Sequence, residues 1–272
     1  MSERYNHGAV KDVKKANPLQ LLLNECLTRI YIENILLSGQ ENLEEVRQLI
    51  AAGEKVVFAF NHLSNFDAPA IISALRRHGF QDIAQRTVFI LGAKLLLNKL
   101  TSKFVGGYSF IPVWPPNLKP KNAEQEKMAM SFTYKSIRAT RSVIKQGGII
   151  ALFPEGGRSR TSQLIEGYPA ISHYLEGNWV VPIGLYGTET VLPIGALIPR
   201  KKSYVAMNVG KPIDIPAVKA DFNHLIPREE KRGTLVDYVM IEIAKLLPDE
   251  YQGVYRDISK TEPAASTLVI GN

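Results

Sequence analysis

Short apolar runs alternate with longer segments of helical periodicity along most of the chain. Continuous apolar runs of this length are typical of buried strands, and they occur at 55–60, 87–91, 108–114, 149–153, 180–187 and 203–210. Helical patterns occur at 42–52, 67–77, 93–104, 123–145, 163–177 and 229–247. Strands that alternate with helices and are apolar on both faces predict an α/β fold, with a mainly parallel mixed sheet flanked by helices.

A further helix is predicted near the N-terminus, over residues 17–37. Pro18 suits its first turn, and Ser38-Gly39 suits its end. Its broad apolar face leaves two interpretations open: the helix packs on the core, or it lies on a membrane surface. We expect one α/β domain organised as a helical extension (1–49), an α/β core (50–215), and a C-terminal helix and tail that pack on the core (216–272).

Composition supports a folded protein that does not depend on disulfides. The chain has 272 residues, of which 45% are hydrophobic, enough for one substantial core. Cys26 is the sole cysteine, which excludes an internal disulfide framework and a cysteine-rich zinc site. The polar N-terminus shows no secretory pattern, and no apolar run reaches the ~18 residues that a spanning helix needs. We therefore expect a soluble or peripheral protein.

The charge of the chain indicates anionic partners. A net charge of +7 and a pI of about 9.3 are compatible with nucleic acid, phosphorylated small molecules or a negative lipid surface. The basic residues are scattered and form no aromatic-basic stripe, which disfavours nucleic acid. Basic clusters at 76–77, 200–202 and 228–232 either attract anionic headgroups or are solvated.

The stretch "FNHLSNFD" (60–67) places His62 just beyond a predicted strand and Asp67 at a helix start. Ligands of open α/β sheets bind at the carboxyl ends of strands. In a strand–loop–helix connection the two side chains can converge, so that the aspartate orients the imidazole and the other ring nitrogen accepts a proton. Alternatively, Asp67 only caps the helix. No second histidine or cysteine lies nearby at a ligand spacing, which argues against a metal.

A second candidate site follows the strand at 149–153, in "FPEGGRSRT". Gly156 and Gly157 allow the backbone to bend so that amides point at an anion. Arg158 and Arg160 supply forked donors that match phosphate oxygens, and Ser159 can donate a further hydrogen bond. The alternative is a turn with solvated arginines. The Gly-Lys-Ser/Thr ending of a Walker loop is missing.

Taken together, "NHLSNFD" and "FPEGGRSR" resemble the motifs of the glycerolipid acyltransferases, the family of lysophosphatidate and glycerol-3-phosphate acyltransferases. That family carries His-x4-Asp and Phe-Pro-Glu-Gly-x-Arg-Ser in this order. Weaker matches are Ala93-Lys94 and Pro182 in "VVPIGL", and the resemblance covers about residues 50–215. One departure leaves the acceptor open, because Pro112 and Val113 replace the Asp and Arg of the family's second motif.

The resemblance implies an O-acyltransferase that needs no metal or redox cofactor. His62 would be the general base and Asp67 its partner. The donor would be acyl-CoA or acyl-carrier protein, and the acceptor a lysophospholipid, most simply 1-acyl-glycerol-3-phosphate. Arg158 would hold the acceptor phosphate and Glu155 would bind its hydroxyl or brace an arginine. The expected substrate site is completed by the following residues: Gly156, Gly157, Ser159, Arg160 and Lys94.

A cytoplasmic enzyme bound peripherally to an anionic membrane surface is the simplest account that also uses the positive charge. Two alternatives stay open. The acceptor is instead glycerol 3-phosphate, another lysophospholipid or a lyso-aminolipid, or the protein binds lipid on the same fold without catalysis.

Overall fold

The computed structural model describes residues 12–93, 102, 105–114, 118–222 and 231–257. Within these ranges one sheet of eight strands forms the centre of the molecule. The strands are β1 (Ile32–Ser38), β2 (Val56–Phe60), β3 (Thr87–Gly92), β4 (Phe110–Val113), β5 (Ile149–Leu152), β6 (Trp179–Tyr186), β7 (Ser203–Val209) and β8 (Ile213–Asp214). Each of the six apolar runs therefore forms a strand, as predicted.

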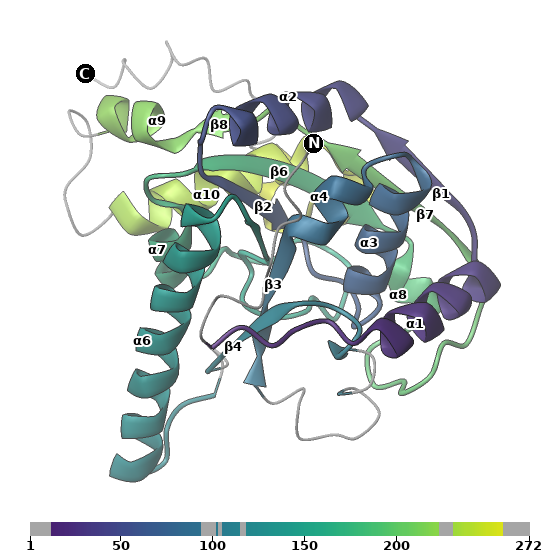
Figure 1. Ribbon diagram of the computed structural model, residues 1–272, viewed down its shortest axis with the longest axis horizontal. Coiled ribbons are helices and arrows are strands. Elements are labelled where there is room, and N and C mark those ends of the chain that lie inside the picture. The colour runs from purple at the N-terminus through teal and green to yellow at the C-terminus, as the bar shows by residue number, and fades with distance from the viewer. Residues whose placement is uncertain (1–11, 94–101, 103–104, 115–117, 223–230, 258–272) are drawn as a thin grey trace.

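The strand order is β1-β7-β6-β2-β5-β3-β4, and β8 pairs with β6. From β6 to β4 the neighbouring strands are parallel. β7 runs antiparallel to β6, and β1 is parallel to β7. The sheet is thus mixed and mainly parallel, which confirms the predicted fold class (Figure 1).

Helices cover both faces of the sheet. They are α1 (Pro18–Tyr31), α2 (Gln40–Ala51), α3 (Asp67–Arg77), α4 (Gln81–Arg86), α6 (Ala123–Lys145), α7 (Ser172–Leu175), α8 (Thr188–Val191), α9 (Ile215–Phe222) and α10 (Lys231–Ala244). None of these described helices combines the length and the apolar content that a bilayer crossing requires.

Two apolar clusters lie on the two faces of the sheet. Phe58 and Phe60 of β2 pack with α2, α3 and α4 in one cluster. Val57 and Ala59 pack with α6, α7 and α10 in the other. Because successive side chains of a strand point to opposite faces, a strand covered on both sides has no polar position. That is why the strand runs are continuously apolar.

Two predicted helices are shorter in the structure, and the second breaks at the glycine and proline that the sequence places within it. The helix expected over 17–37 ends at Tyr31, and β1 begins at Ile32. Ile32 and Ile35, the two buried residues of β1, have a helical spacing, and a register irregularity between Ile32 and Asn34 lets the strand bury both when it pairs with β7. The helix expected over 163–177 is interrupted by Gly167 and Pro169, which leaves a 3-10 turn (Pro169–Ile171) and the short α7.

Other segments were not anticipated or lie outside the described residues. The short elements α4, α8, α9 and β8 had no clear signal in the sequence. Most of the helix predicted over 93–104 falls outside the described residues.

Candidate active site

His62 and Asp67 lie in the loop that joins the carboxyl end of β2 to α3. The loop is anchored by Asn61, whose side chain donates to the carbonyl of Leu185 and accepts from its amide, both at 2.7 Å. Leu185 belongs to β6, the parallel neighbour of β2. Asp67 is the first residue of α3, where a negative charge is favoured by the helix dipole.

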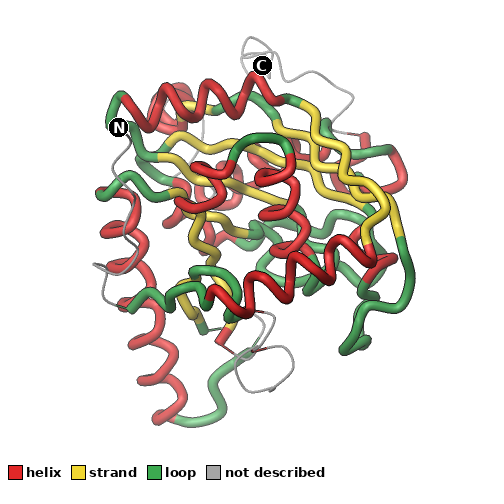
Figure 2. The backbone as a smooth tube through the Cα atoms, turned by 45° about the vertical axis from the view of Figure 1, so that its right-hand side comes forward, coloured by secondary structure: helices red, strands yellow, loops and turns green. Residues whose placement is uncertain are grey.

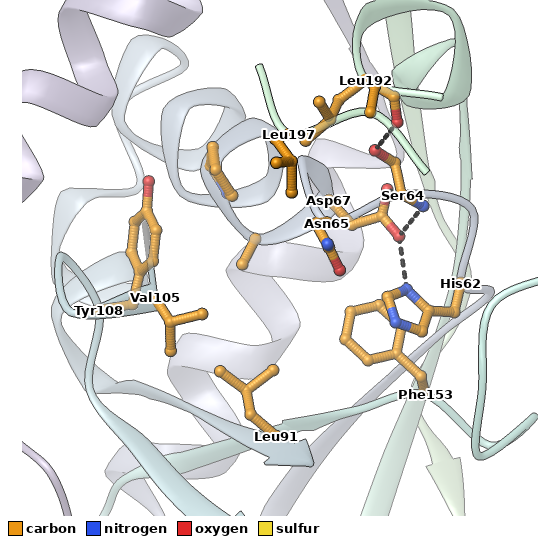
Figure 3. Close-up of a pocket in the computed structure, with 13 residues that line it drawn as sticks. His62, Ser64, Asn65, Asp67, Leu91, Val105, Tyr108, Phe153, Leu192 and Leu197 are labelled. Carbon is orange, nitrogen blue, oxygen red and sulfur yellow. Dashed lines mark hydrogen bonds and ion pairs between the residues drawn. The ribbon is translucent and has the colours of Figure 1, made fainter. Parts of the chain in front are cut away.

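The two side chains meet, as the motif predicted. The His62 Nδ1 lies 2.8 Å from Asp67 Oδ2. The imidazole stacks on the ring of Phe153, with 4.0 Å between centroids. The His62 side chain keeps 17% of its surface exposed, whereas Asp67 keeps 1%. Since Nδ1 faces the carboxylate, Nε2 is the nitrogen that remains for a substrate (Figure 3).

Three further donors hold the Asp67 carboxylate. The amides of Leu63 and Ser64 donate to Oδ2 at 2.9 and 3.0 Å. The hydroxyl of Thr188, which is fully buried, donates to Oδ1 at 2.5 Å. Charge-assisted bonds of this kind are stronger than neutral ones. The carboxylate is therefore fixed in position, with Oδ2 directed at His62.

Thr188 was missed by the sequence reasoning. It follows β6 and is separated from Asp67 by 121 residues. A threonine after a strand carries no signal of its own. Only the parallel pairing of β2 with β6 brings it to the site.

The second motif reaches His62 through the backbone. Glu155 is 6% exposed, and its carboxyl accepts from the amide of His62 at 2.7 Å and from that of Ile165 at 3.4 Å. The amide of Ser159 donates to the carbonyl of His62 at 3.1 Å. Burial raises the pKa of Glu155 to about 8; the two amide donors oppose this, and the charge of Asp67 adds to it.

The remaining residues of this motif lie around the turn. Gly156 adopts φ +66, a conformation suited to glycine. Arg158 is half-buried, and its guanidinium has no ion pair with any described carboxylate. Burial lowers the pKa of Arg158, while the charge of Asp67 opposes that change. Arg160 is exposed, and Lys94 lies outside the described residues.

An apolar pocket opens beside the His–Asp pair. Its walls come from α3, β3, the segment before β4 and the loop after α8. His62 and Phe153 lie at one end and Tyr108 at the other (Figure 3). Apolar side chains dominate the lining: Ala68, Pro69, Leu91, Val105, Leu192, Ala196 and Leu197. The pocket therefore presents the imidazole to an apolar ligand.

The departure in the second family motif falls on an edge strand. Pro112 and Val113 lie in β4 and pair with Leu91 and Gly92 of β3. Leu91 lines the pocket. The arginine of the family's motif is thus replaced at 113 by valine, which packs on the face of the sheet that α6 and α10 cover.

The site thus combines a His-x4-Asp pair with an apolar pocket at the carboxyl end of a mainly parallel sheet. The family model described as Acyltransferase matches residues 34–213, so the chain belongs to this family. The match confirms the resemblance that the two motifs carry.

Two known proteins are similar to this chain. The chain is 29% identical over 133 residues to a chloroplastic glycerol-3-phosphate acyltransferase of Cucurbita moschata; the aligned part is 47% of this chain and 28% of that protein. The chain thus spans about a quarter of the length of this relative. The 1-acyl-sn-glycerophosphate (LPA) acyltransferase PlsC of Thermotoga maritima is 18% identical, with a TM-score of 0.48 over 83% of this chain and 79% of that one.

Proposed function

We propose that the protein transfers a fatty acyl group from an acyl thioester to a hydroxyl of a glycerolipid acceptor. Acyl-CoA and acyl-carrier protein are the donors to consider, and 1-acyl-glycerol-3-phosphate is the first acceptor. The observation that carries the proposal is the pairing of His62 with the buried Asp67, in which His62 also lines an apolar pocket. The apolar pocket has a volume of about 40 Å³, which suits the first carbons of an acyl chain whose reactive carbonyl lies near His62.

His62 acts as general base in this mechanism. Its Nε2 takes the proton of the acceptor hydroxyl while Asp67 supports the imidazolium. The acceptor oxygen bonds to the thioester carbonyl carbon and forms a tetrahedral oxyanion. When the oxyanion collapses, the C–S bond breaks and the thiolate takes the proton from His62. No acyl-enzyme is needed, because the acceptor is activated directly.

Backbone amides are the candidate oxyanion donors. The amides of His62, Leu63 and Ser64 already donate to carboxylates, and that of Gly156 donates to Phe153. Asn65 lines the pocket, and its amide donates to no other described residue. We assign the oxyanion to this amide; one such donor typically contributes about 3 kcal/mol to the transition state.

Arg158 is our candidate for the acceptor phosphate. A half-buried guanidinium without a partner binds a phosphate with paired, charge-assisted hydrogen bonds. Because Val113 cannot supply the arginine of the family's second motif, the acceptor headgroup is either held by Arg158 together with Arg160, Lys94 or a loop lysine, or is not a simple glycerol phosphate. The acceptors that the sequence left open are therefore part of the test.

The test is transfer from labelled acyl-CoA and acyl-carrier protein to lysophosphatidate, glycerol 3-phosphate and neutral lysolipids. His62→Ala should reduce kcat by about a thousandfold, because a positioned base contributes 10²–10⁴-fold. His173→Ala is the matched control, since this histidine is exposed and lies on α7. It should keep wild-type activity.

The outcomes separate the alternatives. Transfer to lysophosphatidate that is lost in His62→Ala supports both base and acceptor. Transfer only to a different lysolipid keeps the mechanism and changes the acceptor. Folded protein that transfers to no acceptor from either donor would instead favour a lipid-binding protein without catalysis.

A further inference from the structure

The helix α1 packs Leu21 and Leu27 on the core, yet its outward side is apolar as well. Its inward side includes Asn24 and Thr28, which are 3% and 1% exposed. The Thr28 hydroxyl donates to the carbonyl of Glu25 at 2.8 Å and lies 3.3 Å from the hydroxyl of Ser73 on α3. On the outward side four large apolar residues keep between 53% and 66% of their surface exposed: Leu19, Leu22, Leu23 and Ile30. The outward side of a helix that faces water is normally polar.

A second group of exposed apolar residues lies in the loop between α8 and β7. Ile194, Leu197 and Ile198 are 40%, 49% and 63% exposed. Leu197 also lines the pocket beside His62. The loop is therefore part of the wall of the candidate active site and part of the outer surface at once.

The two groups are neighbours in space. In both views the loop that leads to β7 runs beside the C-terminal end of α1 (Figure 1, Figure 2). β1 and β7, which follow α1 and the loop, are paired at the edge of the sheet. We refer to the combined set as the docking surface: Leu19, Leu22, Leu23, Ile30, Ile194, Leu197 and Ile198. Exposed apolar surface of this kind marks an interaction site.

Basic side chains border the docking surface. Arg29 lies on α1, and Arg200, Lys201 and Lys202 follow the loop; all are exposed. None of them forms an ion pair with a described residue. The exposed acid next to them is Glu33, at the start of β1. Apolar side chains with a basic border match the chemistry of an anionic lipid surface, which combines acyl chains with phosphate headgroups.

We infer that the docking surface inserts into the headgroup region of an anionic phospholipid bilayer and places the mouth of the pocket at the lipid. This inference rests on the proposed function and deepens it. A lipid acceptor could then pass from the bilayer along Leu197 to His62 without crossing water, and the acylated product could return the same way. The first half of the predicted helix 17–37 would thus contact the membrane through one side and the core through the other.

The test uses the full chain and vesicles of two compositions: phosphatidylcholine alone, and phosphatidylcholine with phosphatidylglycerol. Co-sedimentation should show tighter binding to the anionic vesicles. Leu22→Ser/Leu23→Ser should weaken this binding by at least about tenfold, because two apolar side chains no longer leave water. Lys201→Ala/Lys202→Ala should weaken it by about thirtyfold on anionic vesicles and leave neutral vesicles unaffected.

A matched control comes from α6. Met130 and Tyr134 are 68% and 70% exposed on a helix remote from α1 (Figure 1). Met130→Ser/Tyr134→Ser removes a comparable apolar area and should leave vesicle binding unchanged. Equal loss in this control and in the α1 variant would overturn the specific surface. Circular dichroism of all variants separates lost docking from lost folding.

Activity distinguishes the failure of the docking surface from the failure of the proposed function. With an acceptor in vesicles the α1 variant should lose transfer, whereas with a short-chain acceptor dissolved as monomer it should match the wild type. Transfer by a wild type that binds no vesicles would overturn the docking surface alone. Vesicle binding without transfer would overturn the proposed function and keep the surface.

The oligomeric state tests a different occupant. If the wild type is a dimer that binds no vesicles, and Leu22→Ser/Leu23→Ser makes it monomeric, a second copy of the chain covers the surface.

Discussion

The imidazole of His62 is fixed by groups from separate parts of the chain. Asp67 binds Nδ1, Phe153 stacks on the ring, and Glu155 accepts from the backbone amide. Each contact restrains a different motion: rotation of the ring, tilt of the ring, and displacement of the backbone. A base held in this way loses little entropy when the substrate binds.

Thr188 should support catalysis through Asp67. Thr188→Val keeps the shape of the side chain but removes the buried donor to Oδ1. Because a hydrogen bond to a charged group contributes about 1.5–3 kcal/mol, we expect kcat to fall by about tenfold or more, with a smaller change in KM. Steady-state kinetics would measure this.

The control for this prediction is Thr188→Ser. It restores the hydroxyl without the methyl group and should recover most of the activity. If valine and serine reduce kcat equally, packing of the methyl group matters and the hydrogen bond does not.

Glu155 should make stability depend on pH. Its pKa is about 8 in the folded protein and about 4.5 otherwise. Between these values the folded state holds a proton that the unfolded chain has released, so the free energy of unfolding falls as pH rises. Glu155→Gln cannot titrate, and its carbonyl can still accept from His62. Urea denaturation should show the variant gaining stability relative to wild type from pH 4.5 to pH 8. Parallel curves across this range would contradict the raised pKa.

At the scale of elements, the sequence predicts what depends on local pattern. Both faces of β2 are apolar, and this pattern predicts a buried strand. The connection from this strand to a helix predicts that His62 and Asp67 converge. The segment 32–38 reads as a helix because Ile32 and Ile35 have a helical spacing, and only the irregular pairing with β7 shows that it is a strand. Pairing over long sequence separation likewise places Thr188 at Asp67, which no local pattern reveals.

Gly187 links β6 to α8 and so positions Thr188. It adopts φ +95, and a Cβ there would lie 2.1 Å from the carbonyl oxygen of Tyr204. Gly187→Ala should lower the free energy of unfolding by roughly 2 kcal/mol or more, since strain and a backbone clash add. It should also reduce kcat, because α8 must move.

Gly177 offers a matched control for this substitution. It adopts φ +74 with nothing near the position of a Cβ. Gly177→Ala therefore carries the backbone strain alone, and it should cost about 1 kcal/mol without affecting kcat. Equal losses of stability in the two variants, measured by urea unfolding, would argue against a clash at Gly187.

At the scale of the molecule, chemistry and surface gather around one part of the sheet. The carboxyl ends of β2 and β5 carry the two motifs, and the loop before β7 joins the pocket to the docking surface. β1 belongs to this sheet, whereas α1 packs against α3. The boundary expected at residue 49 stays a prediction, and the family match begins at residue 34.

Truncation tests how far the N-terminal segment is part of the fold. Removing residues 1–31 deletes α1 but keeps β1, and the shortened chain should stay folded and monomeric with lower stability. Removing residues 1–38 also deletes β1, which carries Ile32 and Ile35, 2% and 3% exposed. Losing each of these side chains from the core costs about 1.5–3 kcal/mol, and β7 becomes an open edge prone to association. Size-exclusion chromatography and thermal melts should show aggregation of the longer truncation only. If the shorter truncation aggregates as well, α1 rather than β1 protects this edge of the sheet from association.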